Sequence, residues 1–455
     1  MDSPSALSQL ARVEHLDVDT SDRALDEARA DKSGHRSDSA PLAVVYPSTI
    51  EAVQTVMRWA TEHRVPVVTR GGGSGLAGGA IGSDGEIVLS LERLNRILEI
   101  SISDRLARVE AGVINADLNA AAQEHGLWFG PDPASRAWST VGGNIATNAG
   151  GLLCAKYGVT REAVLALTVV LADGRVIRPG HRSVKGVTGL DLTQLFIGSE
   201  GLLGIIVEAT VKLLPTPHTE TWTLAARFSD IAAATDACED ITSSGHTPTV
   251  LELVDNVALG PIHEYLGLEA PEPTEVLLIA QSDSANAAGD IATFAAVCER
   301  HGARTDSHGA GEEAEALLQL RRSMHPAMEQ HGTVLIEDVA VPRSQLGAMF
   351  REVRRIEAER NVLIPTVAHA ADGNLHPNFI VPGETVPEHI WEAAGELFRS
   401  ALALGGTLTG EHGVGLLKKR WLGDELGDDQ IELHRGIKSV FDPMHILNPG
   451  KVFDA

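Results

Sequence analysis

The sequence contains few cysteines and few basic residues. Its three cysteines, Cys154, Cys238 and Cys298, lie far apart and form no CxxC pair. This excludes a disulfide scaffold, and also a cysteine-bound zinc or iron–sulfur site made by this chain alone. Isolated thiols favour a reducing compartment, so we expect a cytoplasmic protein. Lys and Arg number 37 against 62 Asp and Glu, a formal net charge of -25, and so acidic a surface disfavours nucleic-acid binding.

Long apolar segments are absent as well. The longest apolar run is 163–172, well short of the roughly 20 residues that a membrane helix needs. The N-terminal residues are polar and acidic and lack the apolar core of a signal peptide. We therefore expect no transmembrane segment, and we expect any peripheral contact with a membrane to be made through a partner.

Glycine, in contrast, is abundant, with 45 residues, many of them clustered. Residues 73–78 match GxGxxG and follow a predicted strand at 65–69. A Rossmann dinucleotide site also needs a helix that opens at the third glycine. The next residues, 79–85, cannot start a stable helix because they contain three more glycines. The nicotinamide interpretation is therefore rejected, and two remain: a nest of backbone N–H groups that holds an anion beside Arg70, or an ordinary surface turn.

Two further clusters favour a ligand over a surface turn. Residues 130–135 and 140–151 combine glycines with Asn and Thr side chains, and residues 198–204 form a third glycine-rich element. Small residues let backbone approach a flat ring system, and amide and hydroxyl groups can hydrogen-bond ring carbonyls and nitrogens. The sequence therefore predicts a planar, phosphorylated ligand.

The hydrophobic pattern predicts two successive structured regions. Strands are expected at 43–47, 65–69, 86–91 and 107–111, helices after the capping residues 48–51 and at 116–124, and a hairpin of 165–171 with 175–177. The Pro-Thr-Pro segment within 213–217 predicts a domain boundary. Beyond it, strands at 222–228 and 275–282 alternate with helices that begin near 230 and 285, which favours a second, α+β domain. Residues 1–40 are expected to form a short helix and a loose segment.

A second group of chemically active residues lies near the C-terminus. His369 and His376 flank the turn 372–374, and such a turn would bring both imidazoles together. Glu411 and His412 are enclosed by glycines in GEHG. Two histidines and a carboxylate form a ligand set for a divalent ion such as Zn²⁺ or Mn²⁺. The alternative is that these histidines are turn and cap residues.

The glycine motifs carry a family resemblance. RGGGSGLAGG, DPAS, TVGGNIATNAGG, KYG and GSEGLLGI occur in this order, and the region 41–215 resembles the FAD domain of the vanillyl-alcohol oxidase and p-cresol methylhydroxylase (PCMH) superfamily. The resemblance implies two subdomains around FAD, with the diphosphate on the loop 70–80. Because the loop contains no histidine, it also implies non-covalent FAD. The cofactor residues it implies are Arg70, Gly71, Gly72, Gly73, Ser74, Gly75, Leu76, Gly79, Pro131, Asp132, Ser135, Thr140, Gly142, Gly143, Asn144, Thr147, Asn148, Gly150, Gly151, Gly204, Ile206 and Asn448.

The C-terminal half resembles the glycolate oxidase, D-lactate dehydrogenase and D-2-hydroxyglutarate dehydrogenase branch of that superfamily. The carrying motifs are HAADGNLHPN, in which Ala371 replaces a common glycine, GEHG, and the tail FDPxxxLNPGK. The resemblance implies that His369, His376 and Glu411 bind the metal and that His412 is the base beside the flavin. It further implies that Arg321 binds the substrate carboxylate, with the neighbouring Arg322 as an alternative.

Together these features predict an α+β fold with a two-subdomain PCMH-type FAD-binding domain, an α+β substrate (cap) domain, and a C-terminal tail that returns to the FAD domain. The expected boundaries are 1–40 for an N-terminal segment, 41–215 for the FAD domain, 216–405 for the cap domain and 406–455 for the C-terminal segment.

The expected activity is oxidation of a (D)-2-hydroxy acid of the glycolate or D-lactate type by an FAD-linked dehydrogenase. D-2-Hydroxyglutarate is the alternative substrate. It is disfavoured because Glu337 stands where such members carry a cation, although Arg322 or Arg343 could supply one. Two other classes on this fold are an alkyl-glycerone-phosphate synthase-like flavin transferase and a non-catalytic or electron-passing subunit. The expected partners are the hydroxy acid, an external electron acceptor (a quinone, electron-transferring flavoprotein, a cytochrome or an iron–sulfur subunit) and, as a candidate assembly, a second copy in a homodimer.

Overall fold

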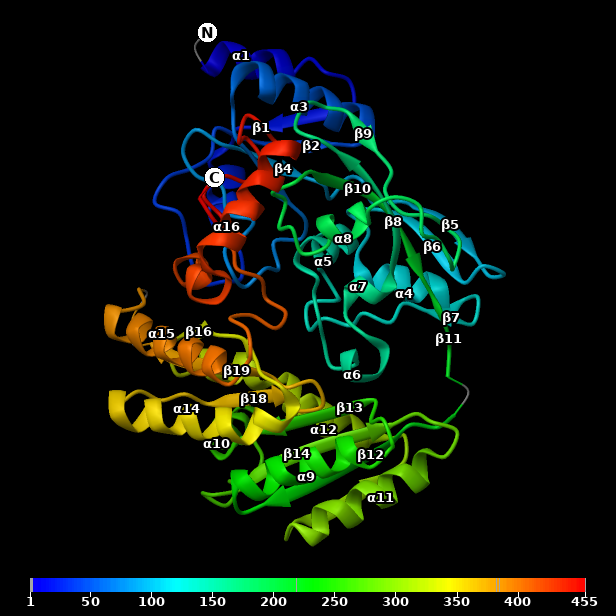
Figure 1. The fold of residues 1–455 in the computed structure, drawn as a ribbon, viewed down its shortest axis with the longest axis vertical. Coiled ribbons are helices and arrows are strands. Elements are labelled where there is room, and N and C mark those ends of the chain that lie inside the picture. The colour runs from blue at the N-terminus through cyan, green and yellow to red at the C-terminus, as the bar shows by residue number, and fades with distance from the viewer. Residues whose placement is uncertain (1–2, 218, 382, 384, 455) are drawn as a thin grey trace. The chain divides into compact units, whose positions relative to one another are not determined.

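The computed structural model describes residues 3–217, 219–381, 383 and 385–454. The chain forms two compact units. Unit 1 comprises the residues up to Gly151, Gly158–Thr216 and the residues from Glu411 on, and unit 2 comprises Leu152–Tyr157 and Pro217–Gly410 (Figure 1). The chain thus enters unit 2 after Thr216, inside the Pro-Thr-Pro segment, and returns to unit 1 at Glu411.

The first sheet of unit 1 has the strand order β1-β2-β4-β3, in which β4 runs parallel to both β2 and β3. Helix α3 (Ile50–His63) covers it with an apolar face that includes Val53, Val56 and Met57. Thr49 caps this helix because its side chain accepts a hydrogen bond from the Ala52 amide. The strands are β1 (Leu16–Asp19), β2 (Ala43–Pro47), β3 (Val67–Arg70) and β4 (Ile87–Ser90).

The second sheet of unit 1 is antiparallel throughout, with the order β5-β6-β10-β8-β9. Strands β8 and β9 form the predicted hairpin, and Gly174 takes the positive φ of 80° in its turn. The strands are β5 (Ile97–Ser101), β6 (Leu106–Glu110), β8 (Val164–Val170), β9 (Val176–Ile177) and β10 (Ile205–Lys212), and β7 (Leu127–Trp128) pairs separately with β11 (Leu214–Pro215).

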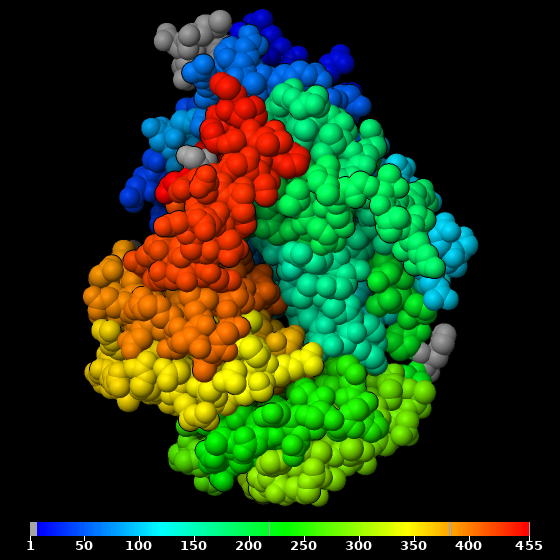
Figure 2. Space-filling model, in the orientation of Figure 1, coloured from blue at the N-terminus to red at the C-terminus, as the bar shows by residue number. Residues whose placement is uncertain are grey.

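The C-terminal segment completes unit 1. Helix α16 (Leu422–Phe441) is kinked at Gly427. Together with the residues that follow it, this helix lies against the N-terminal part of unit 1 and against residues 158–216 of the same unit (Figure 2). Buried Lys438 donates hydrogen bonds to the carbonyl oxygens of Leu202 and Leu447 and pairs with Asp442. The tail therefore folds back onto this unit, as the resemblance implied.

The remaining helices of unit 1 are short. They are α1 (Ser3–Leu10), α2 (Asp22–Ala28), α4 (Asn115–Gln123), α5 (Val141–Thr147), α7 (Thr160–Ala163), α8 (Leu192–Phe196) and the 3-10 turn η2 (Lys419–Trp421).

Unit 2 is built on an eight-stranded sheet. Seven of its strands follow the order β15-β12-β14-β13-β18-β19-β16, and the eighth, β17, pairs with β19. Neighbouring strands along this order are antiparallel. The strands are β12 (Trp222–Phe228), β13 (Val250–Val254), β14 (Val276–Ser282), β15 (Arg304–His308), β16 (Thr333–Ile336), β17 (Val339–Ala340), β18 (Thr366–His369) and β19 (Asn374–Val381).

Helices flank the sheet of unit 2 (Figure 1). Side chains alternate between the two faces of a strand, and one face places Val250, Val254 and Val367 in a core shared with α10, α12 and α13. The helices are α6 (Cys154–Tyr157), α9 (Ile231–Ser243), α10 (Asn256–Leu266), α11 (Ala287–Arg300), α12 (Glu312–Arg322), α13 (Met324–Glu329), α14 (Leu346–Arg360), α15 (Glu388–Ala403) and the 3-10 turn η1 (Arg343–Gln345).

Two segments differ from the sequence-based expectation. The expected loose part of residues 1–40 contains strand β1 and helix α2, because β1 extends the first sheet through antiparallel pairing with β2. The glycine-rich run after Thr140 forms helix α5 in spite of its poor helix propensity. Among the described residues, no helix combines the length and the apolar character needed to cross a bilayer.

Candidate functional site

Two glycines at the start of the loop 70–80 bring it against a second backbone segment. A Cβ at Gly71 would collide with the Thr140 hydroxyl, and one at Gly72 would collide with the Trp138 carbonyl oxygen. Glycine is therefore required at position 72 for the close approach of two backbone segments, and at position 71 a Cβ would displace the Thr140 side chain, before any ligand is considered. As the sequence predicted, no helix follows Gly78, and strand β4 comes next.

The guanidinium of Arg70 lies beneath this loop. Its Nη1 donates hydrogen bonds to the carbonyl oxygens of Ala30 (2.8 Å) and Ala80 (3.1 Å), and Gly73, at φ 69°, leaves room for the guanidinium. Burial lowers the pKa of Arg70, which the nearby carboxylate of Asp31 opposes. Arg70 thus shapes the loop and adds a positive charge below it, and its contact with the cofactor stays a prediction.

Helix α5 carries most of the second glycine cluster. Thr140 caps it by accepting a hydrogen bond from the Gly143 amide (3.1 Å), and a Cβ at Gly142 would collide with Ala111. The Nδ2 atom of Asn144 is buried and has no hydrogen-bond partner among the described residues. An unsatisfied buried amide is costly, and a bound cofactor with an acceptor at this point would satisfy it.

A similar open position occurs at Asn448. Its Nδ2 donates to the carbonyl oxygens of Gly79 (3.0 Å) and Glu200 (2.6 Å), which ties the tail to the loop, whereas its Oδ1 is buried without a partner in the described parts of the chain. Asn144 and Asn448 both belong to the predicted cofactor set, so the residues present fit an FAD site.

Sequence reasoning did not single out Glu200. Its carboxylate accepts hydrogen bonds from the Val414 (2.8 Å) and Gly415 (2.9 Å) amides and so anchors the chain just after His412. Desolvation raises the pKa of Glu200, and the two amides oppose that shift. Its position inside the GSEG motif was the sequence feature that could have identified Glu200 as a candidate.

A cavity of about 590 Å³ lies beside the start of the loop, within the size range of small-molecule sites. Its lining includes Arg70, Gly71, Gly72 and Thr140 of the predicted set, and also the acidic residues Glu27, Glu92 and Asp117. All predicted cofactor residues belong to unit 1. Pro131 and Gly151 are among those that lie outside both the loop and α5. The carbonyl oxygen of Pro131 accepts a hydrogen bond from Asn115 Nδ2, and a Cβ at Gly151 would meet the Asp132 carbonyl group.

The two predicted metal histidines meet in unit 2. His369 ends β18, His376 lies in β19, and the turn 370–373 joins these strands into a hairpin. His376 is opposite Val367, which lies two residues before His369, so both histidines point to the same face of the sheet. Their ring centroids are 5.0 Å apart and both residues are buried.

A buried glutamate that the sequence analysis missed connects this pair to Arg321. Glu252, in β13, is paired across the strands with His369. Its Oε1 lies 2.6 Å from His369 Nδ1, and its Oε2 accepts a hydrogen bond of 2.6 Å from Arg321 Nε. The signal was a single Glu in the otherwise apolar strand Val250–Val254.

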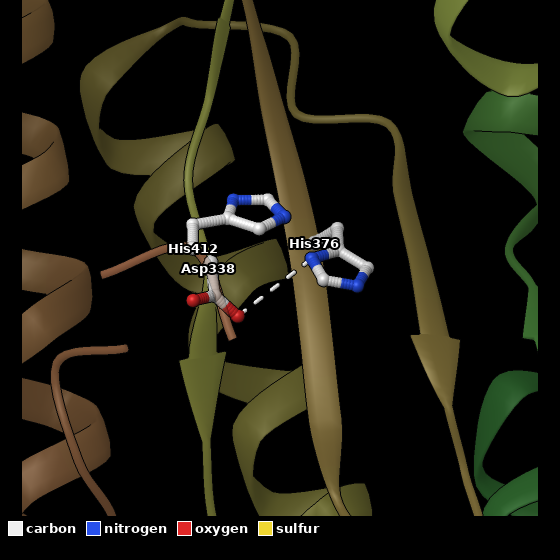
Figure 3. Close-up of side chains that lie close together, drawn as sticks. All are labelled: Asp338, His376 and His412. Atoms are coloured by element: carbon white, nitrogen blue, oxygen red, sulfur yellow. Dashed lines mark ion pairs between the residues drawn. The ribbon is translucent and has the colours of Figure 1, made fainter. Parts of the chain in front are cut away.

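His376 has its own buried carboxylate. Nδ1 of His376 lies 3.7 Å from Asp338 Oδ1, the pair joined by the dashed line in Figure 3. Asp338 also accepts hydrogen bonds from Asn374 Nδ2 and from the Thr409 hydroxyl, both 2.6 Å. Carboxylates behind imidazoles are typical of metal-binding histidines, whose rings they orient.

The two candidate arginines occupy different environments. Arg321 is buried at the end of α12 against Glu252, whereas Arg322 pairs with Glu315 at the surface of the same helix (2.7 Å). Glu411 and His412 belong to unit 1, where His412 Nε2 lies 3.8 Å from Glu411 Oε1. The predicted catalytic set is therefore divided: its arginine and two of its histidines come from unit 2, and its glutamate and third histidine from unit 1.

A backbone site shaped by glycines and a cluster of imidazoles and carboxylates are features expected of a two-domain flavin oxidoreductase. A family model for an FAD binding domain matches residues 41–180, and one for the C-terminal domain of FAD linked oxidases matches residues 218–452. The chain belongs to this FAD-linked oxidase family, and it is an FAD-dependent oxidoreductase that acts on hydroxy acids.

Curated relatives support this assignment. The chain is 40% identical to the glycolate oxidase subunit GlcD of Bacillus subtilis, over 91% of this chain and 89% of that protein. It is 36% identical to a D-lactate dehydrogenase of Archaeoglobus fulgidus (90% and 91% covered) and to a D-2-hydroxyglutarate dehydrogenase of Xanthomonas citri (91% and 89%).

Solved structures share the fold. A p-cresol methylhydroxylase structure has a TM-score of 0.76 at 18% identity and covers 99% of this chain and 97% of its own. An alkyldihydroxyacetonephosphate synthase structure has a TM-score of 0.75 at 20% identity, with 99% and 85% covered. The predicted fold class and superfamily are confirmed.

Proposed function

We propose that this enzyme oxidises a (D)-2-hydroxy acid of the glycolate or D-lactate type to the 2-oxo acid, with non-covalent FAD and a divalent metal, Zn²⁺ or Mn²⁺. The observation that carries the proposal is the buried pair His369 and His376, backed by Glu252 and Asp338 and lying beside Arg321. Imidazoles held in this way are ligands for borderline divalent ions.

The proposed ligands are His369, His376 and Glu411. Thr409 donates to Asp338 next to the hairpin, and Glu411 follows Thr409 by two residues in the chain, which supports its inclusion. When bound, the metal would lower the pKa of the substrate hydroxyl group, and the flavin would accept a hydride from the α-carbon.

The protein residues then have separate tasks. Arg321 holds the substrate carboxylate by charge-assisted hydrogen bonds and so fixes which face of the α-carbon is presented. His412 takes the hydroxyl proton on a ring nitrogen while the C–O bond becomes C=O. A positioned base of this kind typically contributes ~10²–10⁴ in rate.

A monocarboxylic substrate is favoured by the charges near the hairpin. Glu337 is buried there and is an acid where a second substrate carboxylate would need a cation. Arg322 is engaged by Glu315, and Arg343 is exposed, so neither offers an obvious replacement. The glycolate oxidase and D-lactate dehydrogenase names of two relatives agree with this preference, whereas the D-2-hydroxyglutarate relative keeps that substrate as the alternative.

Anaerobic stopped-flow reduction of the flavin tests the proposal. Glycolate, D-lactate, L-lactate and D-2-hydroxyglutarate would each be mixed with the oxidised holoenzyme while flavin absorbance is followed. We expect glycolate or D-lactate to be fastest, and His412→Ala to retain FAD and reduce it ~10²–10⁴-fold more slowly. Faster reduction by D-2-hydroxyglutarate contradicts the substrate assignment, and absence of reduction by every acid contradicts the function. The electron acceptor and a homodimeric assembly stay predictions.

A further inference from the structure

Glu252 occupies a position where a charge is expensive. The other four residues of strand β13 (Val250–Val254) are apolar and buried, and Glu252 itself is 0% exposed. An ionised carboxylate in such a place destabilises the fold unless it is fully paired. An apolar side chain of similar size could fill the space, so the requirement for a charge points to the partners of Glu252.

The two carboxylate oxygens serve two different partners. Oε1 faces His369 Nδ1 and Oε2 faces Arg321 Nε, each at 2.6 Å. The side chains come from different parts of unit 2: Glu252 and His369 from paired strands, Arg321 from the end of α12. We propose that Glu252 is a positioning residue that mechanically couples the substrate-binding guanidinium of Arg321 to the metal-binding imidazole of His369. This inference rests on the proposed function.

The contact with His369 selects one ring nitrogen for the metal. An ionised carboxylate only accepts hydrogen bonds, so His369 must carry its proton on Nδ1 to donate to Glu252. The lone pair of the neutral ring is then on Nε2, which becomes the ligand atom. The negative charge behind the ring also makes it a better donor to a cation.

The contact with Arg321 fixes the plane of the guanidinium. Because Nε is engaged by Glu252, the two terminal nitrogens are left for the substrate, and they make no hydrogen bond to the described residues. A fork of two N–H groups in a fixed plane is the geometry that binds a carboxylate through both oxygens. A rotation of Glu252 would therefore disturb the metal ligand and the carboxylate site together.

Asp338 lies behind the other histidine of the pair. It is 3.7 Å from His376 Nδ1, and it accepts hydrogen bonds from Asn374 Nδ2 and the Thr409 hydroxyl. Asp290 provides a matched control elsewhere in unit 2, because it is a buried carboxylate 2.8 Å from the ring nitrogen Nδ1 of His246. Glu252 joins a histidine to an arginine, whereas the hydrogen bonds of Asp290 are to His246 and to the hydroxyl groups of Ser282 and Ser284.

The test compares Glu252→Gln with Asp290→Asn in the FAD-loaded protein. Co²⁺ would be titrated into chelator-treated samples, with visible absorption as the spectroscopic signature and calorimetry for affinity, and pyruvate binding would be followed through the flavin spectrum without metal. We expect Glu252→Gln to raise the Co²⁺ dissociation constant about 10–100-fold, to alter the Co²⁺ spectrum, and to weaken metal-free pyruvate binding about tenfold. Asp290→Asn should change none of these.

A double-mutant cycle tests the coupling itself. Arg321→Lys removes Nε, so it should weaken Co²⁺ binding in the wild-type background and have no further effect when combined with Glu252→Gln. Wild-type Co²⁺ affinity and spectrum in Glu252→Gln, or additive effects in the cycle, would overturn the inference and leave the proposed function intact.

The two failures remain distinguishable. If the wild-type protein binds none of Co²⁺, Mn²⁺ and Zn²⁺, the metal part of the proposed function is wrong, and the coupling falls with it. If Glu252→Gln does not fold, Glu252→Asp replaces it, since it keeps the charge and shortens the reach. A Glu252→Asp protein with unaltered Co²⁺ affinity and spectrum would contradict the positioning role.

Discussion

The candidate cofactor site of unit 1 and the candidate metal site of unit 2 are built from different chemical groups. In unit 1, glycines at 72 and 142 allow backbone segments to approach until no Cβ would fit. In unit 2, an apolar strand and a hairpin carry buried ionisable side chains, Glu252, His369 and His376. The first site depends on glycines that lack a Cβ atom, and the second depends on charged side chains buried where water is excluded.

This difference determines how each site fails. Adding a methyl group to the glycine region displaces backbone, which cannot yield without moving its neighbours. Removing a charged group from the metal cluster leaves its partner buried and unpaired, which costs more than the pair contributed. The two sites should therefore be separable by mutation, each losing its own ligand.

The largest effect is expected for His376→Ala. Removing one proposed ligand should abolish tight metal binding and slow flavin reduction by the preferred hydroxy acid at least ~10³-fold, since Lewis-acid stabilisation is worth several kcal/mol. FAD content should be unchanged, because all predicted cofactor residues lie in unit 1. Metal analysis, the flavin spectrum and stopped-flow reduction measure the three quantities.

The control for that variant is His325→Ala, a partly exposed histidine of unit 2 that pairs with Glu329. It should retain metal and rate. Loss of FAD from His376→Ala would show that the two sites are not independent, and would break the comparison.

A smaller, sharper effect is expected for Gly75→Ala. Unlike Gly71 and Gly72, Gly75 has room for a Cβ, whose nearest neighbour would be Asp31 Oδ2 at 3.7 Å. The fold should therefore tolerate alanine at this position, and the added methyl group would clash only with a ligand bound on the loop. We expect about a tenfold higher FAD dissociation constant, or ~1.4 kcal/mol, measured by flavin fluorescence on reconstitution.

Gly436→Ala is the matched control in the same unit, because a Cβ on this α16 glycine meets nothing within 4 Å. It should leave FAD affinity unchanged and stabilise the protein by about 0.5–1 kcal/mol through helix propensity. Equal FAD affinity in the wild-type and Gly75→Ala proteins would place the diphosphate away from Gly75.

The sequence predicted elements whose signals are local. The strand at 222–228 and the helix expected to begin near residue 230 were both predicted, and the bounds of β12 (Trp222–Phe228) and α9 (Ile231–Ser243) agree closely with that prediction. Helix α5 escaped prediction because the reason for its glycines, the approach of Gly142 to Ala111, is a tertiary contact. Local composition contains no record of that neighbour.

The same limit applies to the metal site. The spacing of His369 and His376 about a turn was sufficient to predict that the two rings meet. Glu252 was not predictable in this way, because it is 117 residues from His369 and 69 residues from Arg321 in sequence. Sheet register, which one sequence does not specify, brings these three residues together.

The smallest effect on function is expected at a buried carboxylate of unit 2 outside the metal cluster, where the change is one of stability alone. Burial raises the pKa of Asp255 to about 7, although Arg354 and the amides of Ala258 and Thr366 oppose the shift. Because the folded-state pKa is raised above the unfolded value, the stability that this group contributes is present at low pH and is lost as the pH rises toward 7. The slope between pH 6 and 7 is limited to about 1.4 kcal/mol per unit for one proton. Asp255→Asn, which keeps a capping oxygen, should remove that part of the pH dependence in thermal unfolding followed from pH 5 to 8.5. Parallel stability profiles for the two proteins would show that Asp255 is already ionised in the folded state, because its pairing with Arg354 outweighs the effect of burial. Buried carboxylates of unit 2 would then be charged outside the metal cluster as well as within it.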